Sequence, residues 1–472
     1  MPAVVSPYQI ILYLCRPKRK KRKMKGKNLT EGSIMGNIVS FSLPYLLSYF
    51  LQTLYGLADL FVVGQYCGVS SITAVSIGSQ VMHMLTVMVV GLAMGTTVVV
   101  ARSVGAGDAE RTKRAVGNTV TLFMVLFLVV SVILLCGADG IVAAMSTPVE
   151  AVAETDAYLT ICFMGVPFIV AYNIIASIFR GMGDSKRPMY FIAVACAVNI
   201  ALDYLFIGGM DMGAKGAALA TTLSQTFSVA VALAYMKRQS SGLRLTKADL
   251  KPNRRVMGNI LKIGVPVSLQ DGFIQIAFIV ITIIANQRGL TDAAAVGIVE
   301  KIIGILFLVP SAMLSTVSAV SAQNIGAGKP DRAVRTLWYA LYITVGFGLV
   351  FATLTQWTSQ TFVGLFTNDA AVIYQGCEYL RGYVWDCVFA GIHFCFSGFF
   401  CACGWSIVSF VHNSISIVFA RVPLSYLASE MYPDTLYPMG LAINVGSLLS
   451  VIICVGVFVW MRRKNKFLSL HN

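Results

Sequence analysis

Four polar side chains in three separate apolar stretches have the residue types and spacing of a buried cation site. Asp59 lies deep in the first apolar run, and Asn199 and Asp203 stand four positions apart in a later one. Residues four apart share one face of an α-helix, and Thr221 or Thr222 follows early in the next run. Carboxylate, amide and hydroxyl oxygens suit a hard cation such as Na⁺. Burial and neighbouring negative charge also favour a protonated acid, so the same groups can hold H⁺ instead.

Further polar residues extend this candidate site along the first run. Gln52 and Tyr55 stand at helical spacing from Asp59, so they support the same helix face. A structural polar cluster is the alternative, because Asp203 stands near a glycine pair at the end of its run.

Long apolar runs must position these residues. Of the 472 residues, 57% are hydrophobic and 12% are charged, whereas soluble domains carry ~25% charged residues. A helix of about 20 apolar residues crosses the hydrocarbon core of a bilayer. We expect twelve such spans, near residues 36–62, 71–101, 115–138, 157–179, 188–207, 214–236, 257–286, 294–323, 337–357, 377–400, 406–429 and 437–461. The composition excludes an ordinary soluble enzyme and predicts an all-α integral membrane protein.

The formal net charge is +15, and the positions of the basic residues indicate how the chain is oriented in the membrane. Nine basic residues lie between Arg16 and Lys27, and most others fall in every second connection between spans. Cytoplasmic loops carry an excess of Lys and Arg, so both termini are expected in the cytoplasm, which requires an even number of spans. We expect a multi-pass protein of the plasma (cell inner) membrane, with no nucleic-acid partner.

The two halves of the chain repeat each other. Gly36-Asn37-Ile38 and Gly258-Asn259-Ile260 stand 222 positions apart, and Gly105-Ala106-Gly107 and Gly326-Ala327-Gly328 stand 221 apart. Each half holds six spans, so the halves share one orientation, as in parallel-repeat transporters. We therefore expect two parallel-repeat six-helix lobes around a central cavity. The expected segments are a basic N-terminal extension (1–27), an N-lobe (28–236), a cytoplasmic linker (237–256), a C-lobe (257–461) and a cytoplasmic tail (462–472).

The motifs and their order resemble the multidrug and toxic compound extrusion (MATE) family over nearly all of residues 28–461. The resemblance rests on Lys27-Asn28-Leu29-Thr30-Glu31-Gly32, Pro44 followed by Asp59, Gly105-Ala106-Gly107, Phe179-Arg180-Gly181-Met182-Gly183-Asp184-Ser185 and Asn199-x3-Asp203. It implies a secondary active antiporter that exports small organic, cationic or amphipathic, drug-like compounds by alternating access. It also implies that Asp59, Asn199, Asp203 and Thr221 bind the coupling ion, Na⁺ or H⁺, and that Pro44 is a hinge.

The second half does not duplicate the acidic cluster. Ile281 stands at the counterpart of Asp59, and Arg421 stands near that of Asn199, so we expect ion coupling in the N-lobe. The other polar residues inside the spans either face substrate or form an internal charge network, which we favour because buried ions generally pair. These residues are Asp271, Gln275, Glu300, Lys301, Asp386 and Arg421.

Two other functions remain open from the sequence. A flippase for a lipid-linked precursor would need a wide basic cavity to bind phosphate groups. Arg421 and Lys301 are few basic residues for such a cavity. A membrane enzyme would need a nucleophile–base pair or a set of metal ligands, and the sequence offers neither convincingly. We expect a monomer with a small-molecule substrate, surrounded by the lipid bilayer. We expect no enzyme activity, no cofactor, and no metal beyond Na⁺ at the coupling site.

Overall fold

The computed structural model describes residues 28–238 and 245–464. The predicted N-terminal extension, part of the predicted linker and most of the predicted tail lie outside these ranges. All regular elements of the described residues are helical, and twelve helical segments are long and apolar enough to cross a membrane. The all-α membrane fold is therefore confirmed, and the segments begin and end within a few residues of the predicted spans in most cases.

The described helices pack as two compact units. Unit 1 holds Asn28 and Leu47–Leu261, and unit 2 holds Leu29–Leu46 and the described residues from Lys262 onward. Both divisions fall inside helices, because α2 (Ile34–Tyr66) begins in unit 2 and α9 (Arg254–Gln287) begins in unit 1. The lobe boundaries drawn from the sequence stay a prediction.

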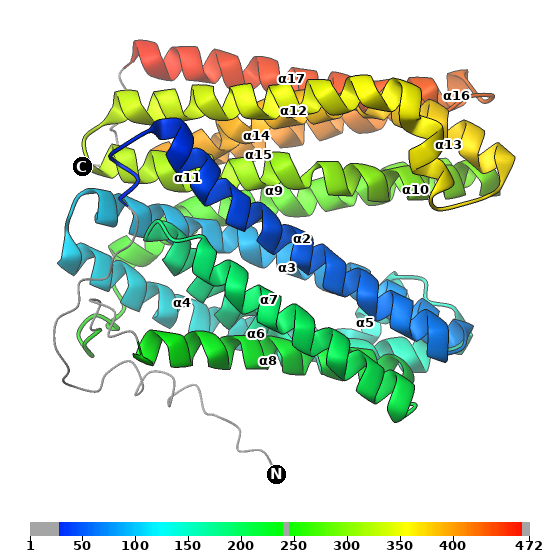
Figure 1. The fold of residues 1–472 in the computed structure, drawn as a ribbon, viewed down its shortest axis with the longest axis horizontal. Helices are drawn as coiled ribbons and strands as arrows, with labels where there is room; N and C mark the ends of the chain where they lie inside the picture. Colours follow the sequence, from blue (N-terminus) through cyan, green and yellow to red (C-terminus); the bar gives the residue numbers. More distant parts are fainter. Residues whose placement is uncertain (1–27, 239–244, 465–472) are drawn as a thin grey trace. The chain divides into compact units, whose positions relative to one another are not determined.

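A central helix organises unit 1. After α2 its elements are α3 (Val69–Gly105), α4 (Ala109–Cys136), α5 (Ala138–Ala144), η1 (Val149–Ala151), α6 (Val152–Gly181), α7 (Lys186–Asp203), the π-helical turn η2 (Tyr204–Gly209) and α8 (Gly213–Arg238). α6 packs against α3, α4 and α8, and Figure 1 shows these helices running along one another. Glycines permit close approach, because a Cβ on Gly165 would collide with Thr222 and one on Gly181 with Val100. Small residues at interfaces are a common basis of helix association in membranes.

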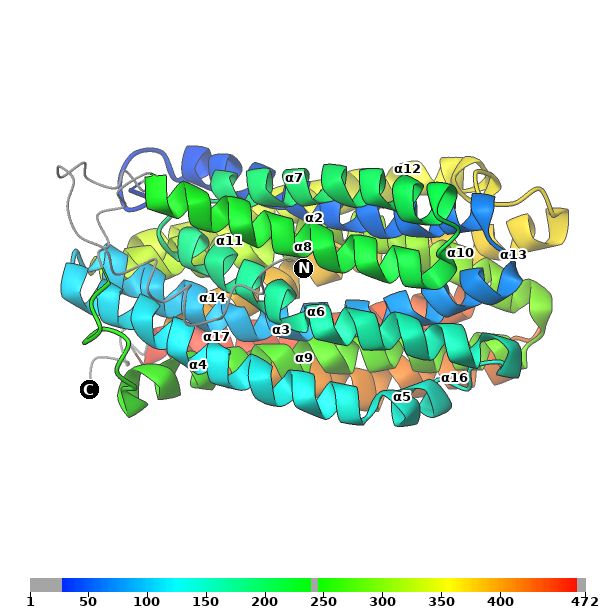
Figure 2. The same cartoon turned by 90° about the horizontal axis from the view of Figure 1, so that it is seen from below.

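Unit 2 is likewise organised around one central helix. Its elements after α9 are α10 (Leu290–Leu306), α11 (Leu308–Gly326), α12 (Pro330–Gly364), α13 (Ala370–Tyr383), α14 (Asp386–Cys403), α15 (Ser406–Ser416), the π-helical turn η3 (Ile417–Arg421), α16 (Val422–Met431) and α17 (Tyr437–Arg463). α14 packs against α11, α12 and α17, and Figure 1 shows these helices running along one another. Figure 2, which gives a view from a second side, shows α7 and α8 of unit 1 side by side. The run predicted as one span at 377–400 is broken between α13 and α14, directly before Asp386.

Local sequence signals set several helix ends. The Asp108 side chain caps α4 by accepting from the Arg111 backbone N–H at 2.9 Å, and Asp369 caps α13 by accepting from the Ala371 N–H at 2.9 Å. Such caps satisfy donors that have no partner inside the helix. Gly404 ends α14 with a φ of 79°, a left-handed conformation that glycine adopts without strain.

The first part of α2 and the segment before it are fastened within unit 2. Lys329 and Arg332, at the start of α12, donate to backbone carbonyl oxygens of residues 30–32 at 2.7–3.1 Å. The Ser315 hydroxyl of α11 donates to the Tyr45 hydroxyl at 3.0 Å. These bonds explain why Leu29–Leu46 belongs to unit 2 although the rest of α2 belongs to unit 1.

Candidate cation site

The predicted coupling residues lie together in unit 1. α2 supplies Asp59, the end of α7 supplies Asn199 and Asp203, and α8 supplies Thr221. All four side chains are buried, and Asp203 is 0% exposed. The Thr221 hydroxyl donates to Asp59 Oδ2 at 3.1 Å, and the Asp59 carboxyl also lies close to the side chains of Asn199 and Asp203. Three helices thus bring four oxygen-bearing side chains into one cluster.

Most polar atoms of this cluster have no protein partner. Asp59 Oδ1, both Asp203 carboxyl oxygens and both Asn199 amide atoms are buried without a hydrogen bond to any described residue. Among the described residues, no Lys or Arg forms an ion pair with either acid. A carboxylate only accepts hydrogen bonds, and buried charges without compensation are costly. The cluster therefore fits a small cation, or a proton held by the two acids.

The backbone changes its geometry at this point. Asp203 is the last residue of α7, and the chain continues directly into the π-helical turn η2. π-helical turns inside α-helices are rare and occur frequently at functional sites. Although Asp203 ends its α-helix, its side chain is fully buried rather than placed at a surface.

Sequence reasoning missed a group of neighbours around these acids. The Gln225 side chain lies next to the Tyr55 hydroxyl, and Tyr158 of α6 is close enough to Asp59 to interact electrostatically. Gln225 follows Thr221 by four residues, so helical spacing could have indicated it. No comparable signal marked Tyr158, because single polar residues on a buried helix have many possible neighbours.

The predicted hinge residue, Pro44, and the residues predicted to share a helix face with Asp59, namely Gln52 and Tyr55, lie in different parts of α2. Pro44 lies in the part that belongs to unit 2, two residues before the division at Leu46 and Leu47. Its ring removes an N–H donor and crowds the carbonyl group one turn earlier. Gln52 and Tyr55 follow in unit 1, where Gln52 is half-buried and forms no hydrogen bond with another described residue.

Unit 2 holds a buried acid that already has a basic partner. Arg421 Nη2 lies 3.5 Å from Asp386 Oδ2 and donates to the Tyr383 hydroxyl at 2.8 Å. The guanidinium carbon lies 5.3 Å from the centre of the Phe278 ring. Asp386 is 0% exposed and Arg421 is 7% exposed. The arginine supplies positive charge inside unit 2, as a bound cation would.

The other predicted residues of unit 2 are less connected. The Glu300 carboxylate accepts from the Thr282 hydroxyl at 3.2 Å. Lys301 is exposed, Asp271 and Gln275 are half-buried, and none of these three forms a hydrogen bond or ion pair with another described residue. The structure therefore brings Asp386 and Arg421 together but does not draw all six predicted residues into one network.

The two clusters occupy related places in the repeat. In the register of 221 residues, Arg421 stands one position beyond the counterpart of Asn199. In both units a π-helical turn of the fifth span adjoins the cluster, because η2 begins directly after Asp203 and η3 ends at Arg421. The clusters differ in charge, because unit 1 carries two acids and unit 2 pairs an acid with an arginine.

Comparisons with known proteins agree with this architecture. The profile of the MatE family matches residues 44–205 and 266–427, which are again offset by 222 residues. The chain is 26% identical over 444 residues to the probable multidrug resistance protein YoeA of Bacillus subtilis (strain 168), covering 92% of this chain and 96% of the relative. It is 25% identical over 368 residues to the multidrug export protein MepA of Staphylococcus aureus (strain N315), covering 78% and 81%. A solved outward-facing multidrug resistance MATE family transporter matches with a TM-score of 0.86 at 24% identity, over 95% of this chain and 100% of that one.

Proposed function

Because the chain belongs to the MatE family of multidrug and toxic compound extrusion transporters, we propose that it exports small organic compounds in exchange for inward Na⁺ or H⁺. The names of the relatives, a probable multidrug resistance protein and a multidrug export protein, support a drug-like substrate. The chain is a multi-pass membrane protein with twelve candidate spans in its described part. The excess of basic residues in alternate connections supports cytoplasmic termini and a plasma-membrane location.

The observation that carries this proposal is the difference between the two buried clusters. Asp59 and Asp203 have no basic partner among the described residues, whereas Asp386 has Arg421. An acid pair without a base requires a mobile cation or proton for neutrality inside the membrane. We therefore assign the coupling ion to Asp59, Asn199, Asp203 and Thr221.

Coupling further requires that ion and substrate have different affinities for the inward- and outward-facing states. Binding of the ion changes the charge next to the second part of α2, which carries Asp59. Because the first part of α2 is fastened within unit 2, we propose that Pro44 acts as a hinge that lets the two parts of this helix respond separately. A cationic substrate would compete with the ion for the same negative charge.

The alternatives have less support. A flippase for phosphate-bearing precursors needs basic groups that are free to bind phosphate, but Arg421 is paired with Asp386. A membrane enzyme is disfavoured because the family consists of transporters. One chain supplies both polar clusters, so we propose a monomer as the working unit.

The test is gradient-driven efflux from proteoliposomes loaded with a fluorescent organic cation such as ethidium. We expect an imposed Na⁺ or H⁺ gradient to accelerate efflux by the wild-type protein. Asp59→Asn should lower efflux to the rate of protein-free liposomes, because a neutral amide cannot bind and release the ion in the same way. Asp139→Asn is the matched control, since Asp139 is an exposed acid on α5. Undiminished gradient-driven efflux by a folded Asp59→Asn protein would contradict the proposed site.

A further inference from the structure

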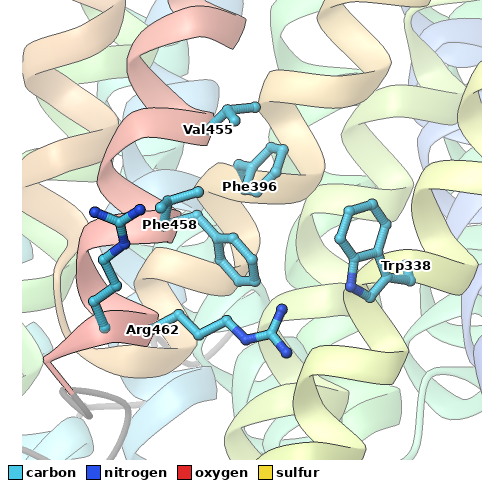
Figure 3. A pocket seen from close by; sticks show the side chains of 7 residues that line it. Trp338, Phe396, Val455, Phe458 and Arg462 are labelled. Carbon is cyan, nitrogen blue, oxygen red and sulfur yellow. The ribbon is translucent and has the colours of Figure 1, made fainter.

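A cavity of about 380 Å³ opens on unit 2 beside the last turns of α17. It is lined by Trp338 of α12, Phe396 of α14, and Val455, Phe458, Val459, Arg462 and Arg463 of α17. Figure 3 shows the rings of Trp338, Phe396 and Phe458 and the side chain of Arg462 around the same space. Phe396 and Phe458 are buried and form the floor, whereas Trp338 is 42% exposed at the side.

The floor of this cavity is a packed set of aromatic rings. The Phe458 ring meets Trp338 edge to face with centroids 6.4 Å apart, and it meets Phe396 with centroids 5.6 Å apart. Such contacts fix the rings in place, so the apolar surface is formed before any ligand arrives. Its volume lies within the range of roughly 300–1,000 Å³ that is typical of ligand pockets.

The mouth of the cavity carries positive charge without compensation. Arg462 and Arg463 are exposed, and neither forms an ion pair or a hydrogen bond with another described residue. This distinguishes them from Arg421, which has Asp386, and from Arg288, which has Asp292 at 2.7 Å. The two arginines are therefore available to an anionic group from outside the protein.

The position of the cavity indicates what that group is. α12 begins at Pro330 and α17 ends at Arg463, so the cavity lies at the end of both spans that the distribution of basic residues assigns to the cytoplasm. Lipid phosphate groups lie at this level of a bilayer, and acyl chains lie immediately below them. Basic pockets between spans on the cytoplasmic side suit anionic head groups, and arginine binds phosphate through two parallel hydrogen bonds.

We propose that this cavity binds an anionic phospholipid of the cytoplasmic leaflet. The lipid phosphate would contact Arg462 and Arg463, and the upper part of one acyl chain would lie along Phe396, Phe458 and Trp338. An ordinary interfacial belt of aromatic and basic side chains is the competing explanation, and it predicts no preference of this cavity for anionic over zwitterionic lipid.

Trp338 provides a direct probe. A variant that retains this tryptophan alone, with Trp357, Trp385, Trp405 and Trp460 replaced by Phe, is placed in phosphatidylcholine nanodiscs. Brominated phosphatidylglycerol or brominated phosphatidylcholine is then added in increasing mole fraction, because bromine quenches tryptophan fluorescence on contact. We expect phosphatidylglycerol to quench Trp338 at about tenfold lower mole fraction than phosphatidylcholine, since each nearby basic residue strengthens binding to anionic lipid.

Variants that replace arginine with neutral glutamine distinguish lipid binding in this cavity from lipid binding elsewhere on the protein surface. Arg462→Gln with Arg463→Gln should remove the difference between the two brominated lipids. Arg254→Gln with Arg255→Gln should retain it, because this exposed arginine pair lies at the start of α9 and does not line the cavity. Equal quenching by both lipids in the parent protein, or an unchanged preference after loss of Arg462 and Arg463, would overturn the proposal.

A second measurement uses the unaltered tryptophans. Native mass spectrometry of the wild-type protein should retain bound phosphatidylglycerol in preference to phosphatidylcholine, and the Arg462→Gln, Arg463→Gln protein should lose that preference. Retention of phosphatidylglycerol to the same extent by both proteins would contradict the assignment. Neither readout depends on transport, so the lipid site and the proposed antiport can fail separately.

Discussion

Asp59 and Asp203 share a buried cluster in which, among the described residues, the Thr221 hydroxyl alone donates a hydrogen bond to an acid, whereas Asp386 lies beside Arg421. In a low-dielectric interior, this difference decides which cluster can exchange a cation. An arginine is always charged and is tethered, so it neutralises Asp386 permanently. In the proposed mechanism, the acids of unit 1 obtain their positive charge from solution, as a coupling site must.

The contribution of Thr221 can be measured. Thr221→Val removes a hydroxyl oxygen that can coordinate Na⁺ beside Asp59, and an interaction with a charged group contributes about 1.5–3 kcal/mol, so half-maximal efflux should need a roughly ten- to hundredfold higher Na⁺ concentration. If the coupling ion is H⁺, half-maximal efflux should instead shift to higher pH, because the charged Asp59 carboxylate loses a hydrogen bond that stabilises it. Thr226→Val is the control one turn further along α8, since that hydroxyl donates only to the Thr222 carbonyl at 2.8 Å. Equal ion dependence of Thr221→Val and the wild type would show that Thr221 is not part of the site.

The buried ion pair of Asp386 and Arg421 in unit 2 predicts how single and double substitutions change the stability of the protein. Removing one partner from a buried ion pair costs about 3–5 kcal/mol, because the other charge is left uncompensated. Arg421→Met alone should therefore lower the thermal unfolding temperature in detergent, and adding Asp386→Asn should restore most of the loss. If the double variant is at least as unstable as Arg421→Met, the two residues do not compensate each other.

At the scale of elements, α2 is the helix that belongs to both units. Lys329 and Arg332 fasten the segment directly before it, and Ser315 donates to Tyr45 in its first part. Its second part carries Asp59, and Pro44 lies near the division. Apolar run length and charge placed this helix correctly. The division within α2 could not be predicted, because one sequence does not show which helices its two parts contact.

The break between α13 and α14 was also beyond sequence reasoning. The broken region contains no proline, and its apolar run continues across the break. Backbone packing accounts for part of it, since Gly382 and Gly440 approach so closely that a Cβ on Gly382 would collide with the backbone at Tyr437. Such contacts between α13 and α17 depend on the tertiary fold and leave no periodic signal.

Arg288, directly after α9, links this helix to the end of α16 and to the segment that follows α16. Arg288, 7% exposed in its side chain, donates to the Ser429 carbonyl at 2.8 Å, to the Pro433 carbonyl at 2.8 Å and to Asp292 at 2.7 Å. Lysine cannot reproduce this fork of donors.

Arg288→Lys should therefore destabilise the protein almost as much as Arg288→Ala, by about 2–3 kcal/mol, because several partly buried acceptors lose a charged donor. The measurement is thermal unfolding together with the rate of proteolysis at residues 432–435. Lys215→Ala is the control, because Lys215 is an exposed basic residue of α8. Wild-type stability of Arg288→Lys would show that charge alone suffices there.

For the whole molecule, a few sequence features predicted most of the architecture. Apolar run length predicted twelve spans, the 222-residue offset predicted two similar halves, and the resemblance implied four residues that the structure places together. An internal charge network that includes Asp386 and Arg421 was expected, but the specific pairing of these two residues and the position of Gln225 beside Tyr55 were not predicted. Helical spacing shows which residues share a face, but it does not show which faces meet.

The central claim is that ion and substrate movements are coupled through Asp59, and reciprocal coupling tests it most directly. Proteoliposomes are loaded with organic cation and with a Na⁺- or pH-sensitive dye, and no ion gradient is imposed. Because antiport links the two flows, outward movement of the substrate should drive Na⁺ or H⁺ inward and raise its concentration inside the liposomes above that outside. The same movement should be absent with Asp59→Asn and present with Asp139→Asn. Substrate efflux by the wild-type protein without any inward Na⁺ or H⁺ movement would contradict the account.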